Sequence, residues 1–171
     1  MGALLRIGRE PLDPQAMVAT LSEQASSGAG ADPSRGAGRD GAVVVFLGLV
    51  RNHNAGRSVR YLEYEAYEPL AVKAFERIAG EIAERWPGAA LALHHRIGRL
   101  EISEASIAIV TCSAHRADAY AANRYAIERV KQIAPIWKRE FFEGGDVWIE
   151  GATADPDDAR AKAEAERVAC A

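Results

Sequence analysis

The sequence predicts an α+β protein with a largely antiparallel sheet and packed helices. The chain has 171 residues, of which 49% are hydrophobic, enough for one domain with a real core. Short apolar segments occur in pairs separated by turn residues, which is typical of β-hairpins. Segments with helical spacing follow these pairs, giving the order β-α-ββα-ββα-ββ. Because hairpins outnumber βαβ crossovers, the antiparallel arrangement is favoured.

The N-terminal part predicts a strand at 4–7 and a helix that begins near Pro14. A stretch rich in Gly, Ala and Ser follows at 25–40, and its composition indicates a mobile loop. The piece before this loop is too small to fold alone, so we interpret the loop as an insertion within a single domain spanning 1–154.

The central part predicts two units of two strands and a helix. The β-branched run 42–50 is typical of a central strand, and we expect it to form a hairpin with 59–66 across the turn residues 51–58. Pro69 then suits the first turn of a helix that ends at Pro87-Gly88. The buried stripe of this helix is expected at Phe75, Ile78, Ile82 and Trp86.

The second unit predicts strands at 91–97 and 106–112, joined across Gly98, and a helix at 116–133 that Pro135 stops. Two further extended segments, 136–142 and 147–150, flank a Gly144-Gly145 turn. The acidic residues around Asp155 predict the cap of an Ala-rich helical tail at 155–171. Val168 is its only large apolar residue, so we expect this helix on the surface or against a partner.

Composition excludes several classes of function. A net charge of −3 argues against generic nucleic-acid binding, and no apolar run approaches the roughly 20 residues that span a membrane. Two cysteines cannot form a disulfide framework, and no metal or cofactor motif is present. These features predict a cytoplasmic protein. Residues 51–60 and 115–139 together carry a net charge of +7, which favours a small anionic substrate.

Two basic clusters are candidate anion sites. Arg51 lies with His53, Arg57 and Arg60 after the first apolar strand, although taken alone this cluster fits a solvated hairpin loop better. The run Ser113-Ala-His-Arg116 lies where a strand ends and a helix begins, where free backbone N–H groups attract anions. The alternative is a Ser N-cap with its neighbours in water.

Lys131 and Lys138 form a third candidate. Lys131 lies in the last turn of a helix, where any cation is favourable, and Glu128 is a possible ion-pair partner. Lys138 shares one face of an extended segment with Ile136 and Glu140. Because Pro135 turns the chain between the two lysines, they can converge on one pocket. Two other groups are weaker: His94-His95 places one ring inward, and Cys112 is expected to be a buried thiol.

Five motifs together resemble the large, catalytic subunit family of molybdopterin synthase. They are Gly48-Leu-Val-Arg-Asn-His-Asn54, Tyr64-Glu-Ala-Tyr67, His95-Arg-Ile-Gly98, Ser113-Ala-His-Arg116 and Ala134-Pro-Ile-Trp-Lys-Arg-Glu140. The resemblance extends from about residue 41 to 150 and implies an α/β-hammerhead-like fold.

The resemblance implies an enzyme that transfers sulfur in molybdenum cofactor biosynthesis. The family converts cyclic pyranopterin monophosphate into the dithiolene molybdopterin and needs no metal or cofactor of its own. Sulfur arrives as a thiocarboxylate at the C-terminus of a small ubiquitin-like subunit. The large subunits form a homodimer within a heterotetramer.

By motif, the resemblance also implies site residues. Lys131 and Lys138 are the expected catalytic pair. The expected substrate-binding residues are Leu49, Val50, Arg51, His115, Arg116, Arg139 and Glu140. Leu49 replaces a lysine found in some members, which removes one possible phosphate contact.

Two alternatives stay open at this point. A non-catalytic module that binds a phosphate or a ubiquitin-like tail predicts that one lysine is dispensable. A Schiff-base lyase using Lys138 predicts an adduct that borohydride traps.

Overall fold

The strands are divided between two sheets that meet near the middle of the molecule. The first sheet has the order β1 (Leu5–Gly8), β5 (Ala90–Arg96), β7 (Ala105–Ser113), β2 (Ala42–Leu49). Only β1 pairs in parallel, and the other neighbours are antiparallel, as the α+β class predicts. The computed structural model describes residues 4–27, 38, 40–149, 151–152 and 154–171.

The second sheet is built on β4 (Arg57–Ala66), which pairs with β8 (Ile136–Phe142) over most of its length. Its other strands are β3 (His53–Asn54), β6 (Gly98–Glu101) and β9 (Gly145–Ile149). The strand β6 replaces the simple connection expected at Gly98, whose φ of +84° lies in the left-handed region that glycine favours.

The hairpin expected between 42–50 and 59–66 is wrong. β2 pairs with β7, whereas β4 pairs with β3, β6 and β8. The short strand β3 takes the hairpin position beside β4, with His53 opposite Ser58. Two apolar runs close in sequence do not specify each other as partners, because pairing follows from which faces must be buried against the helices.

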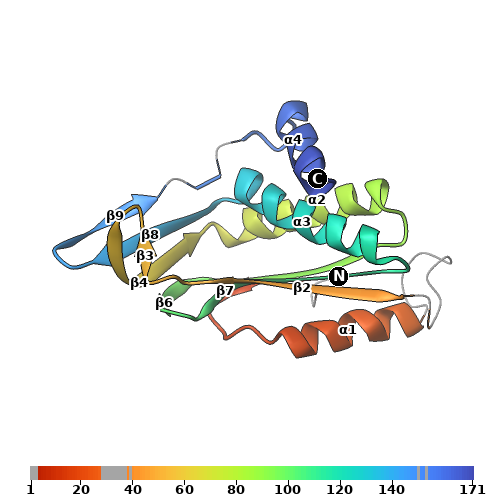
Figure 1. Ribbon diagram of the computed structural model, residues 1–171, viewed down its shortest axis with the longest axis horizontal. Helices are drawn as coiled ribbons and strands as arrows, with labels where there is room; N and C mark the ends of the chain where they lie inside the picture. The colour runs from red at the N-terminus through yellow and green to blue at the C-terminus, as the bar shows by residue number, and fades with distance from the viewer. Residues whose placement is uncertain (1–3, 28–37, 39, 150, 153) are drawn as a thin grey trace.

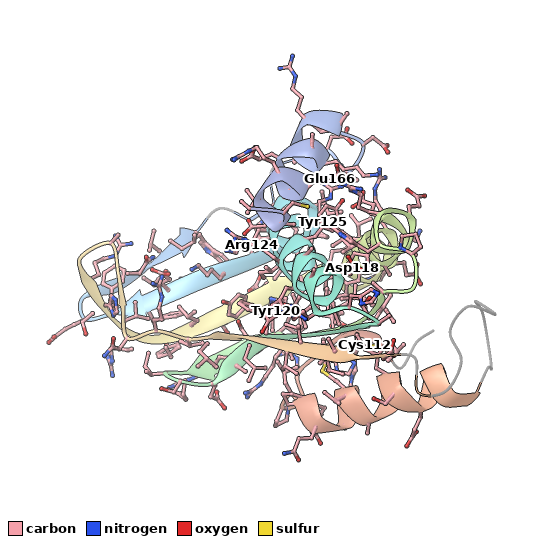
Figure 2. The ribbon with its side chains drawn as sticks, turned by 45° about the vertical axis from the view of Figure 1, so that its right-hand side comes forward. Cys112, Asp118, Tyr120, Arg124, Tyr125 and Glu166 are labelled. Atoms are coloured by element: carbon pink, nitrogen blue, oxygen red, sulfur yellow. The ribbon has the colours of Figure 1, made fainter. Side chains whose placement is uncertain are left out.

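Helices cover both faces of the first sheet. α2 (Glu68–Arg85) and α3 (Arg116–Ile133) lie on one face and α1 (Pro14–Ser27) on the other (Figure 1). The buried stripe expected on α2 is confirmed, with Phe75, Ile78 and Ile82 almost fully enclosed. Cys112 is buried beside α1, also as expected (Figure 2). None of the helices in the described ranges is long and apolar enough to cross a membrane.

The helix α1 extends to Ser27, three residues into the loop expected at 25–40. Helix formation there follows from an Ala- and Ser-containing run without Gly or Pro, which tolerates another turn. The greater part of that loop, residues 28–37 and 39, lies outside the described residues.

The strand β2 is an edge strand, not the central strand that its β-branched run predicts. It ends the first sheet, and α1 packs on β5 and β7 but leaves its side chains uncovered. Val43, Val45, Leu47 and Leu49 are therefore 40–54% exposed. An apolar run identifies a strand that needs covering, but it does not say whether the cover belongs to the same chain.

The C-terminal helix α4 (Ala159–Ala169) stands against α3 (Figure 1). Asp158 caps it by accepting hydrogen bonds from the backbone N–H groups of Arg160 and Ala161, as the acidic run predicts. Ala165 is buried in the main core, so small side chains rather than large ones make this contact. The tail therefore lies on the surface, one of the two expected positions, and contacts its own chain mainly through the buried Ala165.

A buried ion pair fixes the segment that leads into α4. The Arg129 guanidinium of α3 donates two hydrogen bonds of 2.8 Å to the Glu81 carboxylate of α2. The Tyr125 hydroxyl, which lies under α4 (Figure 2), donates to the same carboxylate. Arg129 also donates to the Pro156 carbonyl, and Arg77 pairs with Asp157. The segment is therefore anchored to both α2 and α3.

Candidate functional site

A cavity of about 590 Å³ lies where the two sheets meet beneath the C-terminal end of α3. Its walls come from the ends of β2, β5 and β7, the last turns of α3, and the strands β3, β4 and β8. Gly151 and Ala152, which follow β9, complete the lining. The cavity therefore brings together residues as far apart in the sequence as Phe46 and Ala152.

Lys131 and Lys138 both line this cavity. Ala134 takes an extended conformation at the end of α3, and Pro135 cannot continue the helix, so the chain turns directly into β8. On β8, Ile136, Lys138 and Glu140 face the cavity, while Trp137 on the other face is exposed. The facing expected from strand alternation is therefore confirmed.

The ammonium group of Lys131 forms no ion pair within the described part of the chain. The pairing with Glu128 that sequence spacing allows is thus not made. Lys138 differs, because its Nζ lies 3.1 Å from Oε1 of Glu140. One lysine of the pair is held by a carboxylate, and the other is available to an incoming anion.

Glu140 is the anchor of the cavity. Asn54 donates hydrogen bonds of 2.8 and 2.9 Å to its two carboxylate oxygens, and Arg57 Nη2 lies 3.9 Å away. Burial alone would raise the pKa of Glu140, but the contacts with Asn54, Lys138 and Arg57 outweigh it and hold the pKa below its ordinary value. Glu140 is therefore a fixed anion that orients Lys138.

The remaining lining combines apolar and polar groups. Leu49 and Arg51 contribute from the end of β2 and the turn after it, and His53 follows in β3. Tyr64 and His95 contact each other edge to face, with ring centroids 5.2 Å apart. Three cations, those of Arg51, Lys131 and Lys138, thus surround a partly apolar space, an arrangement that suits an anionic ligand with a ring.

Two of the expected site residues lie outside the cavity. Val50 is buried in a small core with Val59, Leu62 and Leu100. Arg139 lies on the opposite face of β8, where its Nε donates a 2.6 Å hydrogen bond to Asp146. Alternation along a strand separates residues that are adjacent in a motif, so these two side chains do not line the cavity with their neighbours.

His115 and Arg116 also lie away from the cavity. They stand at the N-terminal end of α3, whereas Lys131 is in its last turn, and an 18-residue helix is about 27 Å long. His115 is the N-cap residue of α3 but makes no side-chain capping hydrogen bond. A single chain therefore does not bring this pair to the lysines.

Several cavity residues were not identified from the sequence. The sequence indicates Asn54 as a turn residue and as the last position of the Gly48–Asn54 motif, but it gives the side chain no role. His95 is indicated as half of an alternating pair and as the first residue of the His95–Gly98 motif. Nothing in the sequence marks Gly151 and Ala152 as cavity residues. The structure shows why position 151 is a glycine, because a Cβ there would lie 2.7 Å from the Ile136 carbonyl oxygen. Among the described residues, no group of three or more His, Cys, Asp or Glu is placed to hold a metal ion.

Comparison with known proteins matches this architecture to one family. The family model described as MoaE protein matches residues 7–133. The molybdopterin synthase catalytic subunit of Bacillus subtilis (strain 168) is 53% identical over 109 residues, which are 64% of this chain and 69% of that protein.

Solved structures have the same fold. The crystal structure of molybdopterin synthase from Staphylococcus aureus superposes with a TM-score of 0.74 at 41% identity, covering 86% of this chain and 97% of that one. A complex of subunits 1 and 2 of molybdopterin-converting factor from Helicobacter pylori 26695 has a TM-score of 0.67. It is 23% identical and covers 91% of this chain and 97% of its own, so it supports the fold alone.

Proposed function

The chain belongs to the MoaE protein family, and we propose that it is the catalytic subunit of a molybdopterin synthase. It acts in molybdenum cofactor biosynthesis by transferring sulfur to cyclic pyranopterin monophosphate. The donor is the C-terminal thiocarboxylate of a small ubiquitin-like subunit. In each transfer the thiocarboxylate sulfur replaces an oxygen on a substrate carbon, and water then cleaves the bond between that sulfur and the carrier carbonyl, so that the sulfur stays on the substrate and the carrier leaves as a carboxylate.

The observation that carries this proposal is that the Lys131 ammonium, which forms no ion pair with any described residue, lies in the same cavity as the anchored Lys138. The substrate phosphate and the thiocarboxylate are both anions, and the Glu140 carboxylate engages only one of the two lysines. Lys131 is therefore the group that meets the thiocarboxylate, and Lys138, held at 3.1 Å from Glu140, positions the substrate and moves protons.

Arg51 is the cation of the cavity that suits the substrate phosphate, because its planar guanidinium donates in parallel to two oxygens. Leu49 lies beside it and offers no charge. Phosphate binding in this chain therefore needs further cations from elsewhere, and none of the expected candidates reaches the cavity within one chain.

A second copy of the chain supplies His115 and Arg116 in our proposal. The outer edge of β2 is unpaired in the described structure and carries an exposed apolar row. β2 runs antiparallel to β7, so Leu49 lies at the cavity end of β2 and Ala42 lies opposite Ser113, two residues before His115. Antiparallel pairing of two β2 edges around a two-fold axis brings His115 and Arg116 of one copy toward the cavity of the other.

The deciding experiment combines the purified chain with a thiocarboxylated small subunit and cyclic pyranopterin monophosphate, and measures the dithiolene product. Product formation that depends on the thiocarboxylate is the expected result. Failure with authentic components contradicts the proposal. A borohydride-trapped adduct on Lys138 with simple aldehydes would instead indicate Schiff-base chemistry.

A further inference from the structure

His95 lines the cavity but belongs to neither the lysine pair nor the phosphate-binding cations. It lies near the end of β5, opposite Ile107 of β7, and only 7% of its surface is exposed. The edge-to-face contact with Tyr64 fixes the plane of its ring. A buried polar ring at the wall of a binding cavity needs a partner for each of its nitrogen atoms.

One of the two ring nitrogens is accounted for. Nδ1 lies 2.9 Å from the backbone carbonyl oxygen of Arg96. A carbonyl only accepts hydrogen bonds, so Nδ1 carries the proton and donates. Burial lowers the pKa of His95 to about 4, despite the opposing effect of this hydrogen bond, so the ring is neutral near pH 7. Nε2 is therefore left with a lone pair, and no described residue donates to it.

This lone pair is unusual among the polar groups around it. Arg51, Lys131 and Lys138 can only donate hydrogen bonds, and the Ser106 hydroxyl donates to the Gly48 carbonyl. The oxygens of Glu140 already accept from Asn54 and Lys138. His95 thus offers a buried, neutral acceptor, whereas the other imidazole of the cavity, that of His53, is exposed and donates from Nδ1 to the Asn52 amide oxygen.

The proposed substrate has complementary chemistry at its two ends. Its phosphate is an anion that needs cationic donors, whereas its pterin ring presents N–H groups that need acceptors. A carboxylate would also accept from N–H groups, but it would repel the phosphate and the thiocarboxylate. A neutral imidazole accepts without this penalty.

We propose that His95 is a specificity-determining residue whose Nε2 accepts a hydrogen bond from an N–H group of the pterin ring. The cavity then orients the ring through His95 and the phosphate through its cations. The inference rests on the proposed function, because it takes its ligand from that reaction.

Two substitutions separate this role from a structural one. His95→Asn keeps an N–H near Nδ1 to donate to the Arg96 carbonyl but places nothing at Nε2. His95→Gln places its amide oxygen near Nε2 and so keeps an acceptor toward the cavity. For each variant, calorimetry gives the Kd for cyclic pyranopterin monophosphate and for inorganic phosphate, and the synthase assay gives KM and kcat.

The expected result for His95→Asn is a KM and a Kd for the pterin substrate that rise by about three- to tenfold, the effect of one lost hydrogen bond. Its Kd for inorganic phosphate stays at the wild-type value, and His95→Gln recovers most of the pterin affinity. Unchanged pterin binding by His95→Asn would overturn the inference, as would equal damage to phosphate and pterin binding or equal damage by both variants.

The two proposals fail in distinguishable ways. If the wild-type chain binds the pterin but makes no dithiolene, the proposed function fails, and the calorimetric comparison of the variants still decides the role of His95. If the wild-type chain makes dithiolene and His95→Asn matches its KM, the function stands and the inference about His95 fails.

Discussion

Among the residues of the cavity, Lys131 is the one whose substitution best tests catalysis without changing the stability of the fold. Its side chain forms no ion pair within the described residues, so its loss leaves no buried charge without a partner. Lys138 is different, because removing its side chain takes the ion-pair partner away from the buried Glu140 carboxylate. Substitutions at the two lysines therefore report on different properties of the protein.

We predict that Lys131→Ala lowers the rate of dithiolene formation by about 100-fold or more, the usual size of a lost cationic or hydrogen-bond donor that stabilises a reacting anion. The free energy of unfolding is expected to change by no more than about 0.5 kcal/mol. Single-turnover assays and urea denaturation measure the two quantities. Lys73→Ala, at an exposed position on α2, is the matched control, and a fully active Lys131→Ala would remove this lysine from the mechanism.

His95 makes stability depend on pH in a defined range. Its folded-state pKa of about 4 lies below the ordinary 6.5, so the unfolded chain binds a proton between these values and the folded chain does not. The contribution of the neutral His95 to the free energy of unfolding is therefore fully present above pH 6.5. It is lost as the pH falls toward 4, and the loss amounts to about 3 kcal/mol. Urea denaturation at pH 7 and pH 4 is expected to show a loss in the wild type that exceeds the loss in His95→Gln by about this amount, since Glu81 and Glu140 contribute equally to both; equal losses would contradict the role of His95.

At the level of elements, the contact between α2, α3 and the C-terminal segment depends on one buried charge pair. Arg129 is completely enclosed, and Glu81 accepts hydrogen bonds from Arg129, Tyr125 and Arg77. Burial alone would raise the pKa of Glu81, but these hydrogen bonds outweigh it and hold the pKa below the ordinary value. Both partners are thus charged, and neither can be removed alone without cost.

We predict that Arg129→Met destabilises the protein by about 3–5 kcal/mol, because it leaves the Glu81 carboxylate buried and uncompensated. The double variant Glu81→Leu/Arg129→Met should recover much of this loss, since no unpaired charge remains. Arg124→Ala is the control, because Arg124 is an exposed arginine on the same helix. Chemical denaturation tests the series, and a double variant no more stable than Arg129→Met would refute the explanation.

The positions of helices and strands could be predicted from the sequence more fully than the pairing of the strands. The periodicity of Phe75, Ile78 and Ile82 depends only on local spacing, and the helix is where it predicts. Pairing of β2 with β7 depends on residues about sixty positions away, which no local pattern encodes. The same distinction applies to the cavity: Lys131 and Lys138 flank Pro135 and were placed together correctly, whereas Gly151 reaches the cavity only through the long-range anchoring of its segment.

For the molecule as a whole, the charge pattern of the sequence overstated the positive site. Segments 51–60 and 115–139 hold nine Lys or Arg, but only Arg51, Lys131 and Lys138 among them line the cavity. Arg129 is neutralised by Glu81, and Arg139 is paired with Asp146. A charge count along the chain cannot distinguish cations that bind a ligand from cations that hold the fold together.

The two-copy site predicts complementation between inactive chains. A Lys131→Ala chain retains His115 and Arg116, and a His115→Ala/Arg116→Ala chain retains its lysines. In a mixed dimer one of the two sites is then intact, so a randomly exchanged one-to-one mixture should regain about a quarter of wild-type activity. Assays after mixing, with each variant alone as a control, measure this. No recovery in dimers shown to have exchanged would mean that the site is built within one chain.

The wall formed by Gly151 and Ala152 is made late in synthesis. Both sheets and the helices α2 and α3 leave the ribosome before this segment, and they contain the strand pairings needed to begin folding. Until Pro156 and Asp157 reach Arg129 and Arg77, the cavity lacks one of its walls and the buried guanidinium lacks one of its acceptors. A nascent chain is therefore largely folded before it can hold substrate, and its C-terminal segment is the last part of the chain's own cavity to form.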